Sequence, residues 1–343
     1  MLEEVPMKKL LFLALIAVIL CPFGFSGGAR EPVSKEQAAA AKGEKLDSWP
    51  TKSVTIIVTY KPGGSTGRHA MAIAPYLSKV LGVPVNVEYR EGGNTTVAYL
   101  THINKDPDDG SYIIYGNMNA YCQNALRGVY KYEDVVSLGM LVEGHRILAV
   151  NPKFNRFTDF NDFLTKVEVN PDKYSTAASK GWGAVIEKIF RDNGFKFRAV
   201  PYSGSDERLA FYAGDIDFYL TDYENIASGG DTSTYRPIAI FVDNPPYDIP
   251  VANRVVAELG YKFKFPNMIS PRNFQVKAAF KRKYPERFKM LAGAIKKATS
   301  DPDFLAEMKK SGDVFVFNPR LPEESDHILD KFYEDLTKYK DIF

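Results

Sequence analysis

Two glycine-rich turns are the parts of this sequence whose residue types could do chemistry. In the first, the apolar run 54–58 leads into a turn, and a helical pattern follows at once. The turn consists of Pro62, Gly63, Gly64, Ser65 and Thr66. Backbone amides at a helix start are unpaired and the helix dipole favours negative charge there, so the turn predicts an anion site. A plain tight turn with a helix cap is the alternative, because Ser and Thr also cap helices.

The second turn has the same design. A weak strand pattern at 174–177 precedes it, and a helical stripe that extends to Phe190 follows. The turn consists of Ser179, Lys180, Gly181, Trp182 and Gly183. We expect it to face the first turn across a cleft. For Trp182 the alternative is core packing, because tryptophan is usually largely buried.

Catalytic and nucleotide-binding motifs are absent from the sequence. The first turn does not have the spacing G-x-x-x-x-G-K-[ST] or G-x-G-x-x-G, and there is no G-x-S-x-G. None of the four histidines stands in a metal-binding spacing, and Cys122 has no histidine beside it. The segment Asp106–Gly110 is too poor in spaced ligands for a calcium loop, so a turn is favoured. We therefore expect a binding protein rather than an enzyme, with no cofactor and no metal.

The N-terminus has the pattern of an export signal. Lys8 and Lys9 precede the apolar run 10–20, and small residues allow cleavage after Ser26. Glu3 and Glu4 are unusual in such a segment, which favours Met7 over Met1 as the translation start. Cys21 raises the alternative of a lipid anchor, but Leu20 before it is larger than lipid attachment prefers. We expect a signal peptide at 1–26, a flexible tether at 27–48, and a protein outside the cytoplasm.

The rest of the chain predicts an α/β fold with two lobes. Apolar runs and helical stripes alternate from Trp49 onward, which favours a mainly parallel sheet. We expect one lobe from residues 49–118 plus 241–343 and the other from 119–240, with crossings near 115–119 and 236–242. The formal net charge is +2, from 44 basic and 42 acidic residues, and no basic block indicates nucleic-acid binding.

Several segments, in order, resemble the solute-binding receptors of tripartite tricarboxylate transporters, the Bug family. They include "WPTKSVTIIVTYKPGGSTGRHA", "DPDDGSYIIYG", "YSTAASKGWGAVIEKIF" and "VPYSGSDERLAFYAGDIDFYLTD". The resemblance covers about residues 49–339. It implies a type II periplasmic-binding-protein fold that closes on a small carboxylate through both turns, with Tyr60, Gly204 and Asp222 near the pocket. It further implies membrane permease subunits as partners, and we expect a monomer that binds no nucleic acid.

The chain also departs from that family. Gly67 stands where the family usually has Asp, Met71 where it has Arg and Tyr89 where it has Asn, while Glu187 lies near a usual His. Losing an acid beside local cations predicts a more anionic or bulkier ligand, and we expect Arg68 to tune its charge. A sensory or surface protein that kept the fold without transport is the alternative function, and a hydrolase on a similar fold is a third.

Overall fold

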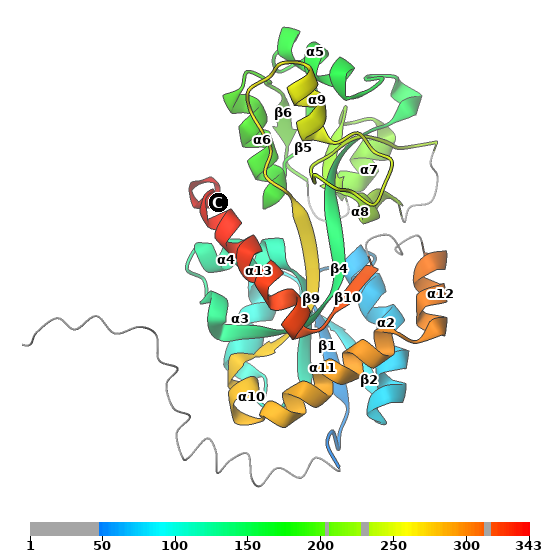
Figure 1. Cartoon of the computed structure of the whole chain (residues 1–343), viewed down its shortest axis with the longest axis vertical. Helices are drawn as coiled ribbons and strands as arrows, with labels where there is room; N and C mark the ends of the chain where they lie inside the picture. The colour runs from blue at the N-terminus through cyan, green and yellow to red at the C-terminus, as the bar shows by residue number, and fades with distance from the viewer. Residues whose placement is uncertain (1–47, 203–205, 228–232, 312–316) are drawn as a thin grey trace, which may run out of the picture.

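The computed structural model describes residues 48–202, 206–227, 233–311 and 317–343, which form two lobes (Figure 1). The expected signal peptide, the tether, Cys21 and Gly204 lie outside the described residues. Among the described residues, no helix combines the length and the apolar character needed to cross a membrane.

The first lobe begins with three neighbouring strands, in which β1 lies between β2 and β3 and is parallel to both. Its strands and the helices that follow them are β1 (Val54–Val58), α2 (Ser65–Leu81), β2 (Val85–Tyr89), α3 (Thr96–Lys105), β3 (Tyr112–Asn117) and α4 (Met118–Leu126). Ile56 and Ile57 point to opposite faces of β1 and both are fully buried, so the strand is covered on both sides. Helix α2 ends at Gly82, whose φ of 71° is the left-handed conformation expected of a helix end.

Two long strands, β4 (Val135–Val150) and β9 (Ile269–Lys277), run between the lobes (Figure 1). Strand β4 pairs antiparallel with β9 as far as His145, and from Arg146 onward it pairs with β7 and β8 of the second lobe. The strand pairing therefore places residues 119–145 in the first lobe. The chain comes back from the second lobe to the first at Ile269, the start of β9. This division differs from the expected crossings near 115–119 and 236–242, because one continuous strand carries the chain across.

The second lobe surrounds a core of phenylalanines. Its elements are α5 (Phe160–Val169), β5 (Ser175–Ala177), α6 (Trp182–Asp192), β6 (Arg198–Val200), α7 (Asp206–Ala213), β7 (Tyr219–Asp222), α8 (Tyr223–Ala227), β8 (Arg236–Ile240) and α9 (Ala252–Glu258). Phe163, Phe190 and Phe218 are fully buried, and Phe163 contacts both of the others edge to face. Such aromatic contacts add to the stabilisation from apolar burial.

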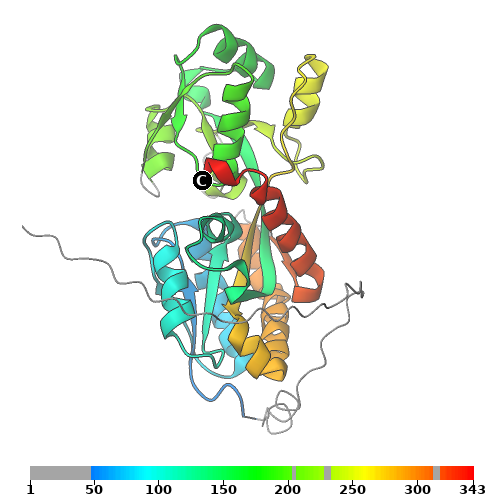
Figure 2. The same cartoon turned by 90° about the vertical axis from the view of Figure 1, so that its left-hand side faces the viewer.

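The C-terminal elements return to the first lobe. They are α10 (Ala278–Lys283), α11 (Pro285–Thr299), α12 (Pro302–Lys310), β10 (Phe317–Arg320) and α13 (Pro322–Thr337). Helices α11 and α12 pack against α2, and α13 packs against β4 and α4. The end of α13 reaches up between the lobes, where the C-terminus lies in both views (Figures 1 and 2). Single 3-10 turns form at η1 (Tyr132–Asp134), η2 (Pro152–Phe154) and η3 (Lys340–Ile342).

The two-lobed α/β architecture predicted from the sequence is confirmed, but the sheet is not mainly parallel. In the part of the chain that the structure describes, parallel pairing joins β1 to β2 and β3, and β5 to β6. The pairings of β4 and β9 are all antiparallel. The expectation of parallel strands was wrong because these two strands do not belong to strand–helix–strand units.

Candidate ligand-binding site

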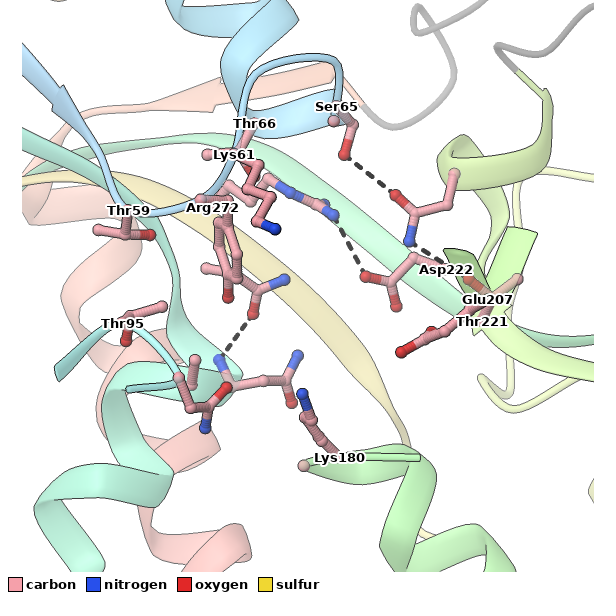
Figure 3. Close-up of a pocket in the computed structure, with 18 of the residues that line it drawn as sticks. Thr59, Lys61, Ser65, Thr66, Thr95, Lys180, Glu207, Thr221, Asp222 and Arg272 are labelled. Atoms are coloured by element: carbon pink, nitrogen blue, oxygen red, sulfur yellow. Dashed lines mark hydrogen bonds and ion pairs between the residues drawn. The ribbon is translucent and has the colours of Figure 1, made fainter. Parts of the chain in front are cut away.

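A cleft of about 430 Å³ lies between the lobes and is lined by residues of both. This volume is in the range of pockets that enclose a small molecule. Ten of the residues expected at the site line it: Tyr60, Pro62, Gly63, Gly64, Ser65, Thr66, Ser179, Lys180, Gly181 and Asp222. Figure 3 shows Ser65 and Thr66 entering from the start of α2 and Lys180 from the segment before α6. The structure thus brings both glycine-rich turns to one cavity.

The start of α2 forms the wall on the first lobe. Gly63 has a φ of +90°, a conformation that side-chain-bearing residues rarely adopt, which allows the tight turn. Gly64 is the N-cap residue and has an extended backbone. No side chain caps the helix, and its first turn holds no acidic residue. The helix start can therefore accept an anion from outside the chain.

The start of α6 forms the facing wall. Its N-cap residue Gly181 has a φ of 53°, and no side chain caps this helix either. A Cβ at Gly181 would lie 3.1 Å from the Cβ of Asn119, so glycine allows the two lobes to approach closely here. The Ser179 amide donates a hydrogen bond of 2.8 Å to Glu187, which anchors the turn. Burial raises the pKa of Glu187, while its hydrogen bonds with Ser179 oppose the shift.

A buried ionic network lies between the two walls. Arg272 of β9 pairs with Asp222 at 3.2 Å and with Glu224, and its side chain is only 3% exposed. The Ser270 hydroxyl donates a 2.8 Å hydrogen bond to the same Asp222 oxygen. Burial alone would lower the pKa of Arg272, but Glu224 and Asp222 raise it more strongly, so Arg272 remains charged.

Two arginines of this network, Arg146 and Arg272, were missed by sequence reasoning. Arg146 of β4 lines the cleft, and its Nε lies 3.3 Å from Asp222. Both arginines lie on the strands that join the lobes, and neither strand has the simple apolar alternation that indicates a strand. In the sequence, each arginine appears only as a charged residue inside a partly polar segment. That pattern does not distinguish an arginine in a cleft from one on the surface.

Hydrogen bonds connect the lobes across the cleft. The Ser65 hydroxyl, on the first lobe, donates to the side-chain oxygen of Asn225 on α8 at 3.1 Å. Within the first lobe, Asn117 and Asn119 donate to the Ser270 hydroxyl at 3.1 and 3.0 Å, and this hydroxyl donates in turn to Asp222 of the second lobe. The hydrogen bonds of Ser65 and Ser270 thus join the two lobes beside the cavity.

Three other residues expected at the site have different surroundings. Trp182 is 1% exposed and does not line the cleft; it contacts Phe332 and Tyr339 of the α13 region edge to face. The packing alternative for Trp182 is therefore what the structure shows. Gly183 and Arg68 are also not among the lining residues. A Cβ at Gly183 would lie 2.5 Å from the Ser179 Cβ, so Gly183 shapes the turn from behind.

Two of the departures from the family compensate each other. A Cβ at Gly67 would lie 3.0 Å from the hydroxyl oxygen of Tyr89, so the tyrosine occupies the space that a side chain at residue 67 would need. A third departure, Met71, is 55% exposed and faces away from the core. The ring of Tyr89 therefore leaves no room for a side chain at residue 67.

Replacing Glu224 with glutamine should flatten the dependence of stability on pH. Burial raises the pKa of Glu224 to about 7, opposed by Arg272 and assisted by Asp222. Because the pKa of Glu224 is higher in the folded state than in the unfolded state, the folded protein binds the proton more tightly. The resulting stability is fully present below pH 4.5 and is lost as pH rises through 7. We expect the wild-type protein to lose on the order of 2 kcal/mol between pH 5 and 8 from this group.

Urea unfolding at a series of pH values measures this effect. The control is Glu143→Gln, which removes a carboxylate of the same type that is 22% exposed and paired with Arg320. Equal pH slopes for wild type and Glu224→Gln would contradict the prediction.

A sequence profile described as tripartite tricarboxylate transporter family receptor matches residues 70–338. Protein BugT of Bordetella pertussis is 26% identical over 237 residues, 65% of this chain and 71% of BugT. A UPF0065 protein of Agrobacterium vitis is 29% identical over 179 residues, and the chain spans about half its length (51%).

Solved structures share the fold. MatC from Rhodopseudomonas palustris, with bound malate, matches with a TM-score of 0.68 at 19% identity, over 86% of this chain and 99% of MatC. A protein described as a periplasmic transporter matches with a TM-score of 0.70 at 23% identity, over 85% of this chain and 97% of that one. Since the profile covers most of its length, the chain belongs to the tripartite tricarboxylate transporter receptor family, whose fold is that of solute-binding proteins.

Proposed function

We propose that this protein is an extracytoplasmic receptor that reversibly binds a small organic anion, a carboxylate, and delivers it to the membrane subunits of a tripartite tricarboxylate-type transporter. One observation carries the proposal: two helix starts without side-chain caps, one from each lobe, line the same cleft. A carboxylate can accept several backbone N–H bonds at such a site without a counter-cation.

The relatives support this ligand class. MatC was solved with malate, and a second R. palustris protein with a TM-score of 0.67 to this chain was solved with adipate, at 18% identity and over 85% of this chain and 98% of that one. Both ligands carry two carboxylates. Partnership with permease subunits follows from the family description and, like the location outside the cytoplasm, is part of the proposal.

The two serine hydroxyls of the glycine-rich turns donate to oxygens that are not bases. Ser65 donates to the amide oxygen of Asn225, which is not a base. Ser179 donates to the carbonyl oxygen of Ala177 at 3.5 Å. A nucleophile needs a partner that removes its proton, and neither hydroxyl has one among the described residues. The arrangement supports binding and release.

A carboxylate should stabilise the purified protein without being consumed. Malate, adipate, succinate and citrate form a suitable panel for thermal shift, followed by calorimetry. A ligand at 100 times its dissociation constant stabilises the folded state by about 2.7 kcal/mol, which gives a clear upward shift in Tm. Chromatography of the ligand after long incubation checks that it is unchanged. Absence of a shift with every carboxylate, or turnover of one, would refute the proposed function.

A further inference from the structure

The end of the cleft near α6 contains an arginine, Arg146, that belongs to neither of the two glycine-rich turns. Arg146 leaves β4 where that strand passes between the lobes, lines the cleft, and is 12% exposed. Its Nη1 lies 3.9 Å from the position that a Cβ at Gly183 would occupy. The guanidinium group therefore lies beside the turn that begins α6.

The charge of Arg146 is only partly balanced within the protein. Its ion-pair partner among the described residues is Asp222, at 3.3 Å from Nε. The other oxygen of Asp222 already accepts hydrogen bonds from Arg272 and Ser270. One carboxylate is thus shared between two guanidinium groups, which leaves positive charge at the cleft.

Positive charge is in excess over the lining of the cleft as a whole. The ionisable lining residues comprise five cations and three acids: Lys61, Arg146, Lys180, Arg208 and Arg272 against Glu91, Glu207 and Asp222. On the second-lobe wall, three cations, Arg146, Lys180 and Arg208, stand against two acids, Glu207 and Asp222, and Asp222 is shared with Arg272. Lys180 has no carboxylate within ion-pair distance among the described residues, so its charge is available to a ligand.

The wall on the first lobe is polar but mostly uncharged. Thr59 and Asn119 line it, are at least 93% buried, and each has a side-chain oxygen without a hydrogen-bond partner among the described residues. Of the two lining cations on this side, Arg272 is already paired with Asp222 and Glu224, and Lys61 is exposed at the rim, 4.0 Å from Glu91. The two ends of the cleft thus differ in charge, and a ligand that fits them differs in the same way along its length.

We propose that Arg146, together with Lys180, binds a second anionic group at the far end of the ligand, so that the receptor selects a dianion over a monoanion of the same length. This inference rests on the proposed function. One carboxylate lies at the start of α2. The other lies at the start of α6, where Arg146 supplies a planar pair of N–H donors suited to a carboxylate. Arg146 is then the residue that distinguishes a dianionic ligand from a monoanionic one.

Three probes of one chain length test the inference by calorimetry. Adipate ends in a second carboxylate, hexanoate replaces that carboxylate with a methyl group, and 5-aminopentanoate replaces it with an ammonium group. The wild-type protein should bind adipate about 10- to 100-fold more tightly than hexanoate, the range of one or two charge-assisted hydrogen bonds. It should bind 5-aminopentanoate most weakly, because that probe brings a positive charge to Arg146 and Lys180.

Arg146→Gln should remove the preference and keep hexanoate binding, which shows that the variant is folded. Lys61→Gln is the matched control: it removes one positive charge from the same cleft at the opposite end, so adipate and hexanoate should change by the same factor. A preserved adipate preference in Arg146→Gln, or tightest binding of 5-aminopentanoate by the wild type, would overturn the role of Arg146 and leave the proposed function standing. Binding of none of these probes, nor of the wider carboxylate panel, would instead count against the proposed function.

Discussion

The variant Gly64→Val should fold normally and lose carboxylate binding about 100-fold or more. A Cβ at Gly64 has only the Lys61 carbonyl oxygen nearby, at 4.0 Å, and the backbone at φ −80° and ψ 165° suits valine. Gly64 lines the cleft, so the isopropyl group would stand where a carboxylate approaches the amides of α2. Losing two hydrogen bonds to a charged group accounts for the expected size of the effect.

Calorimetric titration with a carboxylate that binds the wild-type protein measures this loss, and circular dichroism checks the fold. The matched control is Gly293→Val on α11, where a Cβ meets nothing within 4 Å and the residue is outside the cleft. The control should bind like the wild type. Wild-type affinity in a folded Gly64→Val protein would show that the start of α2 does not hold the ligand.

The variant Arg272→Met should destabilise the protein by about 3–5 kcal/mol, the cost of leaving a buried ionic partner unpaired. Arg272 is 2% exposed, and its removal leaves the carboxylates of Asp222 and Glu224 together in a buried site. Methionine retains much of the length of the arginine stem, so loss of charge dominates over loss of packing.

Urea unfolding gives the change in free energy. At pH 8, above the pKa of about 7 of Glu224, the double variant Arg272→Met, Glu224→Gln should recover part of the stability, because a buried glutamine needs neither a cationic partner nor a bound proton. In contrast, Lys188→Met breaks an exposed ion pair with Asp192, whose side chains are 53% and 55% exposed, and should cost under about 1 kcal/mol. A loss in Arg272→Met as small as that in Lys188→Met would show that the network contributes little to stability.

The elements that sequence reasoning predicted well have local signals. Helix α2 is apolar every three or four residues and ends at Gly82, so its end was predictable to the residue. The turn before α6 was predictable for the same reason, because Gly181 and Gly183 stand between a strand and an apolar stripe. The expectation that the two turns face one another came from their shared design, a strand followed by glycines and a helix start, and residues of both turns line one cleft.

The parts that were missed depend on contacts between distant residues. Strand β9 contains Pro271, Arg272 and Asn273, which are disfavoured in an isolated strand. It forms because β3 and β4 flank it on both sides, and because Asp222 and Glu224 neutralise its arginine. The lobe boundaries were displaced for the same reason, since a strand that crosses between lobes leaves no loop in the sequence to mark the crossing.

The packing of Trp182 has an optical consequence. The chain has two tryptophans, and Trp49 is not among the cleft-lining residues and packs against Phe280. Trp182 follows directly after a cleft-lining glycine of the second lobe while its ring rests on Phe332 and Tyr339 of the C-terminal region. If the lobes rotate against one another when a ligand binds, the surroundings of the Trp182 indole change, because its ring packs on C-terminal residues. We therefore expect ligand binding to shift the tryptophan emission of the protein, without an attached dye.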